Sequence, residues 1–166
     1  QIVAYPDDKL QIDIQIDYKS KVLGFQYASL DGFENFASAI APARTFVFLH
    51  EVEFLLKNNL IKGGDIDNAI VIIDRKVTQE ELDRLAELFN KPKIKVQPEG
   101  ILNNISLNFT NEAARHKLLD FIGDMSLIGQ PIKGRIIATR PGHYANNQFA
   151  RMLRNIIKKD RLKTKV

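Results

Sequence analysis

Apolar and polar residues alternate most regularly near the start of the chain. Between Leu10 and Tyr18 every second position is apolar or aromatic, which is the pattern of a strand with one buried face. Residues 24–30 are its expected hairpin partner, and residues 2–5 and 135–139 are rich in the residue types that favour strands. The pattern therefore predicts strands from both ends of the chain.

Three segments in the first half of the chain have the apolar spacing that is typical of helices. Residues 33–41 and 51–60 each end close to a helix-breaking Pro or Gly. Residues 78–90 begin with Thr78 and Glu81, which are spaced as in a capping box, where each side chain caps the backbone of the other residue. This last segment is the clearest predicted helix.

Two more helices are expected over residues 112–125 and 144–159. Short strands are expected at 44–48, 69–73, 94–96 and 105–109. Strands and helices follow one another in no regular order, which is typical of the α+β class. We therefore predict a two-layer sandwich in which helices cover one face of a mixed or antiparallel sheet, with a small βαβ insert at residues 46–73.

The composition limits where the protein works and what can bind a metal. The 166 residues include no cysteine, so disulfides and thiolate ligands are excluded and a metal must be held by His, Asp or Glu. The lack of cysteine and of a secretory segment favours a cytoplasmic location. No apolar run approaches the roughly 18–20 residues of a membrane span, so no transmembrane segment is expected.

The net charge of +4 arises at the end of the chain. Residues 158–166 contain five basic residues and one acidic residue, so the remainder is close to neutral. A basic terminal run is typical of a solvated tail or linker. Nucleic-acid binding is a less favoured alternative, because no aromatic and basic motif accompanies the run. The first residue, Gln1, and the abrupt end lead us to expect a segment of a longer chain.

The helix predicted over 112–125 carries polar residues in line. His116, Asp120 and Asp124 are spaced four residues apart, which places them on one stripe of a helix whose other positions are mostly apolar. A neutral imidazole and a carboxylate one turn apart can chelate zinc. The motif is weak by itself, since a His and an Asp at this spacing can also form a simple surface pair.

A second histidine follows in a turn. His143 comes directly after Pro141-Gly142, between a predicted strand and a predicted helix, where loops commonly present catalytic groups. Asp124 is the natural partner to orient this imidazole. The alternative is that His143 merely begins a helix and has no further role.

Several motifs resemble one enzyme family. They are the run 115–124 with His116, Asp120 and Asp124, the segments 127–129 and 142–147, and upstream the segments 41–46 and 63–71. Taken together, and in their order along the chain, these motifs resemble the second domain of UDP-3-O-acyl-N-acetylglucosamine deacetylase. That family catalyses the committed step of lipid A (lipopolysaccharide) synthesis in Gram-negative bacteria, and it uses zinc.

The resemblance implies roles for five residues. His116 and Asp120 would be two of three zinc ligands. Asp124 would orient His143, which as imidazolium would stabilise the oxyanion and protonate the leaving amine. Thr45 would donate a hydrogen bond to the tetrahedral intermediate.

The resemblance also implies contacts with the substrate, a UDP-linked acylated glucosamine. Phe46 would pack on it, and Lys117 would contact its phosphate side, with Arg140 as a further basic residue. Asp17 and Tyr18 match the family's uracil-binding pair.

The 51–60 segment corresponds to a part of the family that lines a passage for the acyl chain. Its apolar residues, Val52 and Leu56 among them, would line that passage. Ordinary core packing is the alternative for these residues.

The family's third zinc ligand and its glutamate base come from a first domain that this sequence lacks. His50-Glu51 consists of the same two residue types, but it lies at the predicted 51–60 helix that would line the acyl-chain passage. We therefore reject it as a substitute. We therefore expect the chain to be inactive alone, and a non-catalytic α+β binding or scaffold domain is the alternative function.

The segment 75–98 is longer than in many family members. It resembles the form in Bacteroidetes-type bifunctional proteins, which are fused to a 3-hydroxyacyl-(acyl-carrier-protein) dehydratase. On this basis residues 1–157 would be the second domain of the deacetylase, and residues 158–166 would be a basic tail or linker.

Overall fold

The computed structural model describes residues 1–58, 68–103 and 105–163. The chain divides into two compact units, which are described separately. Unit 1 comprises Gln1–Asp17, Phe25–Ala43 and Ala114–Val166, and unit 2 comprises Tyr18–Gly24 and Arg44–Ala113.

The sheet of unit 1 contains β1 (Ile2–Tyr5), β2 (Leu10–Asp17), β3 (Phe25–Asp31) and β6 (Gly134–Thr139) in the order β1-β6-β2-β3. Strand β2 pairs antiparallel with β3 and parallel with β6, and β6 pairs antiparallel with β1. The sheet is therefore mixed, and the strands predicted near both ends of the chain are confirmed.

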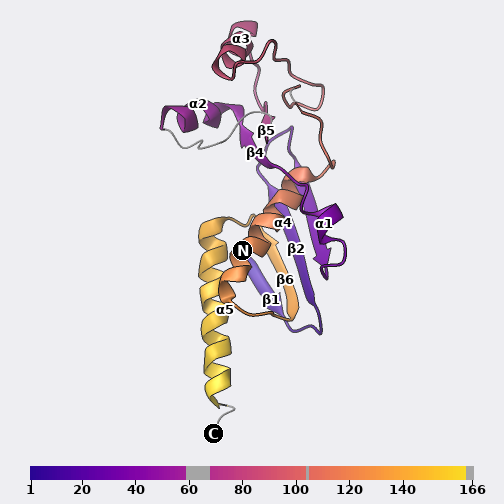
Figure 1. The fold of residues 1–166 in the computed structure, drawn as a ribbon, viewed down its shortest axis with the longest axis vertical. Helices are drawn as coiled ribbons and strands as arrows, with labels where there is room; N and C mark the ends of the chain where they lie inside the picture. The colour runs from indigo at the N-terminus through magenta and orange to yellow at the C-terminus, as the bar shows by residue number, and fades with distance from the viewer. Residues whose placement is uncertain (59–67, 104, 164–166) are drawn as a thin grey trace. The chain divides into compact units, whose positions relative to one another are not determined.

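One face of this sheet is covered by a helix. Ile12, Ile14 and Ile16 of β2 are each at most 1% exposed. Helix α4 (Glu112–Met125) lies over the sheet (Figure 1) and buries Leu118 and Phe121 completely. A short 3-10 helix, η1 (Ser126–Ile128), follows α4, and α5 (His143–Lys163) closes the unit. The predicted α+β class, with helices packed on a mixed sheet, is confirmed.

Unit 2 contains a small parallel sheet. Strands β4 (Thr45–Phe48) and β5 (Ala69–Ile72) pair along their whole length, and α2 (Leu49–Lys57) lies between them in the chain. Helix α3 (Gln79–Leu88) begins with the predicted capping box between Thr78 and Glu81. The core of the unit consists of Leu49, Val52, Val71, Ile73, Leu82, Leu85, Ala86, Ile94 and Leu102.

The helix predicted over 33–41 is much shorter than expected. Only α1 (Phe36–Ala39) is helical, because Ile40 turns inward to 1% exposure while Phe33 remains 51% exposed. The two apolar residues therefore do not share a buried face. The Ile40 and Ala41 amides both donate to the Phe36 carbonyl, which closes the helix early.

The strands predicted at 94–96 and 105–109 are wrong. Among the described residues of these segments only an isolated bridge forms, between Val96 and Leu102. The chain turns back tightly there, since the Gln97 amide donates to the Ile101 carbonyl at 2.7 Å. The side chain of Gln97 also donates to the Ile105 carbonyl at 2.8 Å, which occupies a group that a strand would need for pairing.

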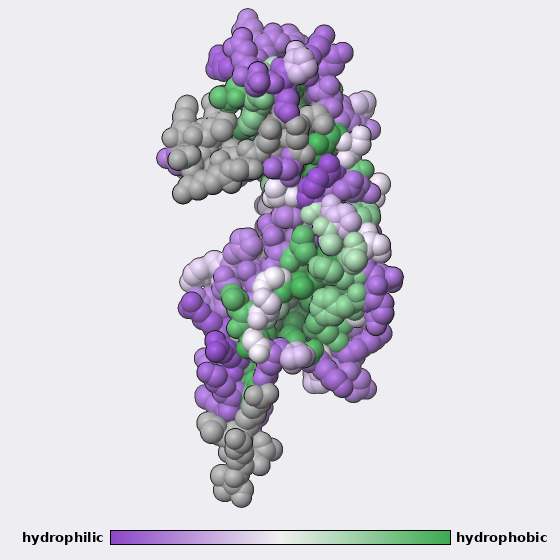
Figure 2. Space-filling view, in the orientation of Figure 1, coloured by the Kyte–Doolittle hydropathy of each residue, from purple (hydrophilic) through white to green (hydrophobic). Residues whose placement is uncertain are grey.

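The hydropathy of the surface differs between the two units. Figure 2 shows hydrophobic surface on unit 1 beside α4, whereas the surface over α3 in unit 2 is mostly hydrophilic. None of the helices in the described part of the chain is long and apolar enough to span a bilayer.

Helix α5 continues through Lys158 as far as Lys163, where the sequence predicted a tail.

Candidate functional site

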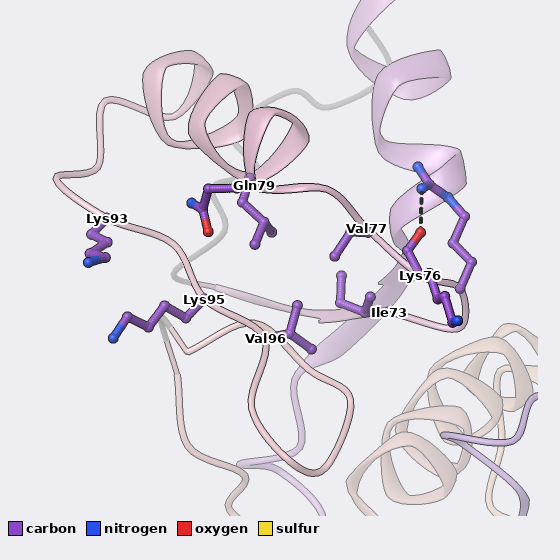
Figure 3. A pocket seen from close by; sticks show the side chains of 9 residues that line it. Ile73, Lys76, Val77, Gln79, Lys93, Lys95 and Val96 are labelled. Carbon is purple, nitrogen blue, oxygen red and sulfur yellow. Dashed lines mark hydrogen bonds between the residues drawn. The ribbon is translucent and has the colours of Figure 1, made fainter.

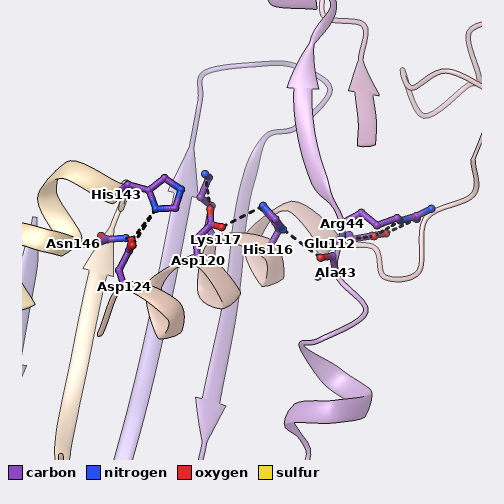
Figure 4. Close-up of polar contacts among 9 residues, drawn as sticks. All are labelled: Ala43, Arg44, Glu112, His116, Lys117, Asp120, Asp124, His143 and Asn146. Carbon is purple, nitrogen blue, oxygen red and sulfur yellow. Dashed lines mark hydrogen bonds and ion pairs between the residues drawn. The ribbon is translucent and has the colours of Figure 1, made fainter. Parts of the chain in front are cut away.

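Helix α4 separates apolar and polar side chains onto different faces. Ala114, Leu118 and Phe121 are buried. His116 and Asp120 lie on another face, half-buried, and Asp124 continues the same stripe (Figure 4). The stripe that was predicted from four-residue spacing is therefore present.

His116 and Asp120 face each other one turn apart. The Nε2 atom of His116 lies 3.4 Å from Oδ1 of Asp120, and each side chain is 17% exposed. The other ring nitrogen, Nδ1, lies 3.3 Å from the Ala43 carbonyl. Because a carbonyl only accepts, Nδ1 is the donor in this contact, which makes Nε2, on the side of Asp120, the ring nitrogen that could bind a metal ion.

This donor set fits a zinc site. A histidine ligand commonly donates its second ring nitrogen to a backbone carbonyl or carboxylate, as His116 does with Ala43. Within the described part of the chain, no group of three or more His, Asp and Glu side chains is placed to hold a metal ion. His116 and Asp120 are therefore a pair of candidate ligands among the described residues.

Lys117 contacts the same carboxylate. Its Nζ donates to Oδ2 of Asp120 at 3.0 Å, and its side chain is 20% exposed. The two oxygens of Asp120 thus face different partners, the imidazole of His116 and the ammonium of Lys117. A compact positive charge lies directly beside the candidate metal ligands.

His143 and Asp124 form a second pair. The Nδ1 atom of His143, the first residue of α5, lies 2.9 Å from Oδ2 and 3.2 Å from Oδ1 of Asp124. The aspartate side chain is 13% exposed, whereas the histidine side chain is 66% exposed. Since an ionised carboxylate only accepts, Nδ1 is the donor in this pair, and Nε2 takes no part in it. The sequence predicted this partnership.

Asn146 holds the same carboxylate from the other side. Its Nδ2 donates to Oδ2 of Asp124 at 2.8 Å, and the residue is 1% exposed. In the sequence Asn146 lies in the 142–147 motif, for which no role of Asn146 was predicted. The available signal was its position one helical turn after His143, which places both side chains on the same side of α5.

Two predicted substrate residues meet in unit 2. The rings of Tyr18 and Phe46 pack edge to face with centroids 5.5 Å apart, and Phe48 lies 5.9 Å from Tyr18. Tyr18 remains 39% exposed. Thr45 is exposed at the start of β4. The structure thus joins an aromatic pair that the sequence analysis assigned to separate motifs.

The remaining predicted site residues have these positions. Asp17 is exposed at the end of β2 in unit 1. Arg140 is exposed after β6 with a left-handed φ of 50°, and its amide donates to the Gln15 carbonyl at 2.7 Å. On α2, Val52 is 2% exposed in the core, and the side chain of Leu56 is outside the described residues.

Two further residues of unit 2 bear on earlier predictions. Phe54 of α2 is 61% exposed and offers apolar surface on the helix where an acyl passage was predicted. His50 stacks on Phe48 with ring centroids 5.6 Å apart, and its Nδ1 lies 3.6 Å from Asp74.

A buried ion pair fixes the chain just before Thr45. The Arg44 guanidinium donates to both carboxylate oxygens of Glu112, at 2.8 Å and 3.0 Å. Burial of Glu112 raises the pKa of its carboxyl, but hydrogen bonds from Arg44 and from the Asn108 amide outweigh this effect and leave that pKa below its ordinary value. The same pair raises the pKa of Arg44.

The chain is similar in sequence to proteins of one enzyme family. A family model described as LpxC, UDP-3-O-acyl N-acetylglycosamine deacetylase, matches residues 1–95 and 89–155. The bifunctional enzyme LpxC/FabZ of Bacteroides thetaiotaomicron is 50% identical over 157 residues, which are 95% of this chain and 34% of that protein. The enzyme of the same name from Porphyromonas gingivalis is 49% identical over 96% of this chain and 35% of its own length.

A single-function relative is more distant. The UDP-3-O-acyl-N-acetylglucosamine deacetylase of Chlamydia pneumoniae is 35% identical over 92% of this chain and 46% of its own length. The chain therefore spans between a third and a half of the length of these relatives.

Proposed function

Because the chain belongs to the family of UDP-3-O-acyl N-acetylglycosamine deacetylases, zinc-dependent hydrolases of lipid A biosynthesis, we propose that it is the second domain of such an enzyme. The intact protein would hydrolyse the N-acetyl group of a UDP-linked 3-O-acylated glucosamine. The observation that carries the proposal is that α4 presents two carboxylates, Asp120 and Asp124, each facing its own histidine.

The first pair suits a metal. We assign Nε2 of His116 and the carboxylate of Asp120 as two zinc ligands, with a third from the first domain of the enzyme. The Ala43 carbonyl fixes the tautomer of His116 that a ligand needs. When bound, zinc supplies an activated water and polarises the amide carbonyl.

The second pair suits proton transfer. Asp124 holds Nδ1 of His143, so the proton on Nε2 of the imidazolium is free to stabilise the developing oxyanion and then to pass to the leaving amine. Asn146 keeps the carboxylate in place by donating to its Oδ2. The family's glutamate base would come from the first domain.

The resemblance to the family also implies the substrate-binding residues, and their charge and exposure support these roles. Lys117 would contact the nucleotide phosphates, supported by Arg140, and Thr45 would donate a hydrogen bond to the reacting centre. Phe46 would pack on the sugar. Asp17 and Tyr18 would bind the uracil, where an exposed aromatic ring and a carboxylate suit stacking and the imide edge.

The acyl-passage prediction concerns α2. Leu56 and Val52 were its predicted wall residues, and Val52 is 2% exposed. Phe54 is 61% exposed and is the better candidate among the α2 side chains that the structure describes, because a lipid needs exposed apolar surface.

The proposed organisation extends beyond the chain. Residues 1–157 would be the second domain with its lipid-passage insert at 46–73, and residues 158–166 would lead into a dehydratase domain. The bifunctional names of the relatives from Bacteroides and Porphyromonas support this part. A cytoplasmic location and the lack of nucleic-acid binding stay predictions.

Reconstitution tests the function. The chain is mixed with the separately expressed first domain and zinc, and acetate release from the UDP-linked substrate is measured. We expect release only from the mixture, because two ligands alone bind zinc weakly. His116→Gln should abolish release. His50→Gln is the matched control, and it should leave the rate unchanged because His50 contacts no candidate ligand.

Two results would contradict the proposal. One is tight one-to-one zinc binding, or acetate release, by the chain alone. The other is a mixture that forms a stable complex and binds the substrate but releases no acetate, which would favour a non-catalytic scaffold.

A further inference from the structure

Unit 2 contains an open hollow of 510 Å³ beside α3, between the segments 73–82 and 93–96 (Figure 3). Its apolar lining residues are Ile73, Val77, Leu82 and Val96. Ile73 and Leu82 belong to the core of the unit and are 5% and 7% exposed, whereas Val96 is 37% exposed. The floor is therefore a rigid apolar surface that solvent reaches from above.

Among the described residues that line the hollow, all the charged ones are basic. Arg75 is occupied, since its guanidinium pairs with Glu81 at 2.8 Å. Lys76, Lys93 and Lys95 are exposed, and their ammonium groups form no ion pair with any residue that the structure describes. Figure 3 shows Lys93 and Lys95 on one side of Ile73 and Val77, and Lys76 on the other. The rim thus carries uncompensated positive charge around an apolar centre.

The shape indicates what kind of ligand fits. Sites for small molecules are usually concave enough to bury most of the ligand surface. This hollow is wide open, so a free small molecule would keep much of its surface in water. A larger partner can place one protruding group in the hollow and make its other contacts on the rim.

The same shape argues against a membrane as that partner. Proteins that dock on bilayers insert protruding apolar side chains below the headgroups. Here the apolar side chains lie at the bottom, and the lysines stand around them. A flat lipid surface would meet the lysines and leave the floor untouched, whereas a protruding side chain of a protein would reach it.

We propose that this hollow is a docking site for an acidic amphipathic segment of a partner protein. One apolar side chain of the segment sits on Val77 and Val96, and its flanking carboxylates pair with Lys76, Lys93 and Lys95. Carboxylates three or four residues from the apolar residue on a helix lie on the same face, which matches a charged rim around a central hollow. Charge complementarity steers the encounter and fixes the register.

The test is an amide NMR titration of the chain with a synthetic helical peptide. The peptide carries one Leu flanked by Glu at three- and four-residue spacings. We expect shifts confined to residues 73–82 and 93–96, and weaker binding at higher salt because exposed charges are screened. The triple variant Lys76→Gln, Lys93→Gln, Lys95→Gln should bind about tenfold more weakly.

The matched control removes the same charge elsewhere. Lys21→Gln, Lys133→Gln, Lys158→Gln changes three exposed lysines outside the hollow and should bind the peptide as the unmodified chain does. All six substitutions are at exposed positions, and the amide spectra report whether either variant is misfolded.

Four outcomes would overturn the proposal. They are the absence of shifts at the hollow, an equal loss of binding in both triple variants, equal binding of a peptide with Ser in place of Leu, and the same shift pattern with vesicles of anionic lipid. The third would reduce the site to a non-specific anion patch, and the fourth would assign it to a membrane.

Discussion

The two histidine–aspartate pairs beside α4 contain the same residue types but present opposite ring nitrogens to the carboxylate. His116 directs Nε2 to Asp120 because the Ala43 carbonyl holds its Nδ1. His143 directs Nδ1 to Asp124 and leaves Nε2 outward. In one pair both side chains are 17% exposed, whereas in the other the histidine is 66% exposed.

The difference matches the two proposed roles, a zinc ligand for His116 and a general acid for His143. A ligand needs a free nitrogen beside other donors in a restricted space, and the half-buried position of His116 beside Asp120 suits that proposed role. A general acid needs a nitrogen that a substrate can reach, which suits the proposed role of His143 because its side chain is 66% exposed. On this proposal, one helix supports both roles because Asp120 and Asp124 meet different nitrogens of their histidines.

Asp124→Asn should break the second pair while the first stays intact. An amide can donate to Nδ1 and so favour the wrong tautomer of His143, and the comparable change in a serine-protease triad, a case known from other enzymes, costs about 10⁴ in turnover. We expect turnover of the intact enzyme to fall by about 10³. Zinc content, measured by metal analysis, should not change. Loss of zinc from this variant would mean that the two pairs are not separate.

Glu112→Gln tests whether a third carboxylate of α4 has only a structural role. The side chain of Glu112 is 1% exposed and that of Arg44 is 23% exposed, so the substitution leaves a largely buried guanidinium without its counter-charge. We expect the free energy of unfolding to fall by about 2 kcal/mol, measured by urea denaturation. Asp31→Asn is the control, because the Lys9–Asp31 pair is more than half exposed and should contribute little.

The same variant has a predicted pH dependence. The pKa of Glu112 lies below its ordinary value of 4.5 in the folded chain. Its contribution to stability is therefore complete above that ordinary value and is lost as the pH falls through the lower, folded pKa. Glu112→Gln should flatten this acid-side loss of stability. If stability falls at low pH as steeply in the variant as in the unmodified chain, other carboxylates control that loss.

The sequence predicted the elements whose pattern is local. The alternation in Leu10–Asp17 and the capping box at Thr78 each depend on neighbouring residues, and both are present in the structure. Residues 105–109 were wrongly predicted as a strand because a strand also needs a pairing partner. There the side chain of Gln97 takes the Ile105 carbonyl instead.

The same contrast between local patterns and long-range contacts holds for the site. The stripe of His116, Asp120 and Asp124 follows from helical spacing alone. The Arg44–Glu112 pair joins residues 68 positions apart, and the acceptor for His116 is the Ala43 backbone carbonyl. Neither contact has a signature in the sequence, since long-range pairing and backbone acceptors do not depend on a local motif.

Asn146→Ala tests the difference between the two histidine–aspartate pairs, and we expect it to have the smallest effect of these substitutions. Asn146 touches neither His143 nor the first pair in the contacts described, and acts through Asp124 by donating to Oδ2 at 2.8 Å. Without that donor the carboxylate can rotate, so the His143 ring loses part of its orientation, and we expect turnover to fall about tenfold with KM unchanged. Asn146→Gln should not restore turnover, because its longer side chain misplaces the amide. The imidazole ¹⁵N shifts of His143 should move towards a mixture of tautomers, whereas those of His116 should stay the same. A role that was merely structural would instead lower stability and leave the His143 shifts unmoved.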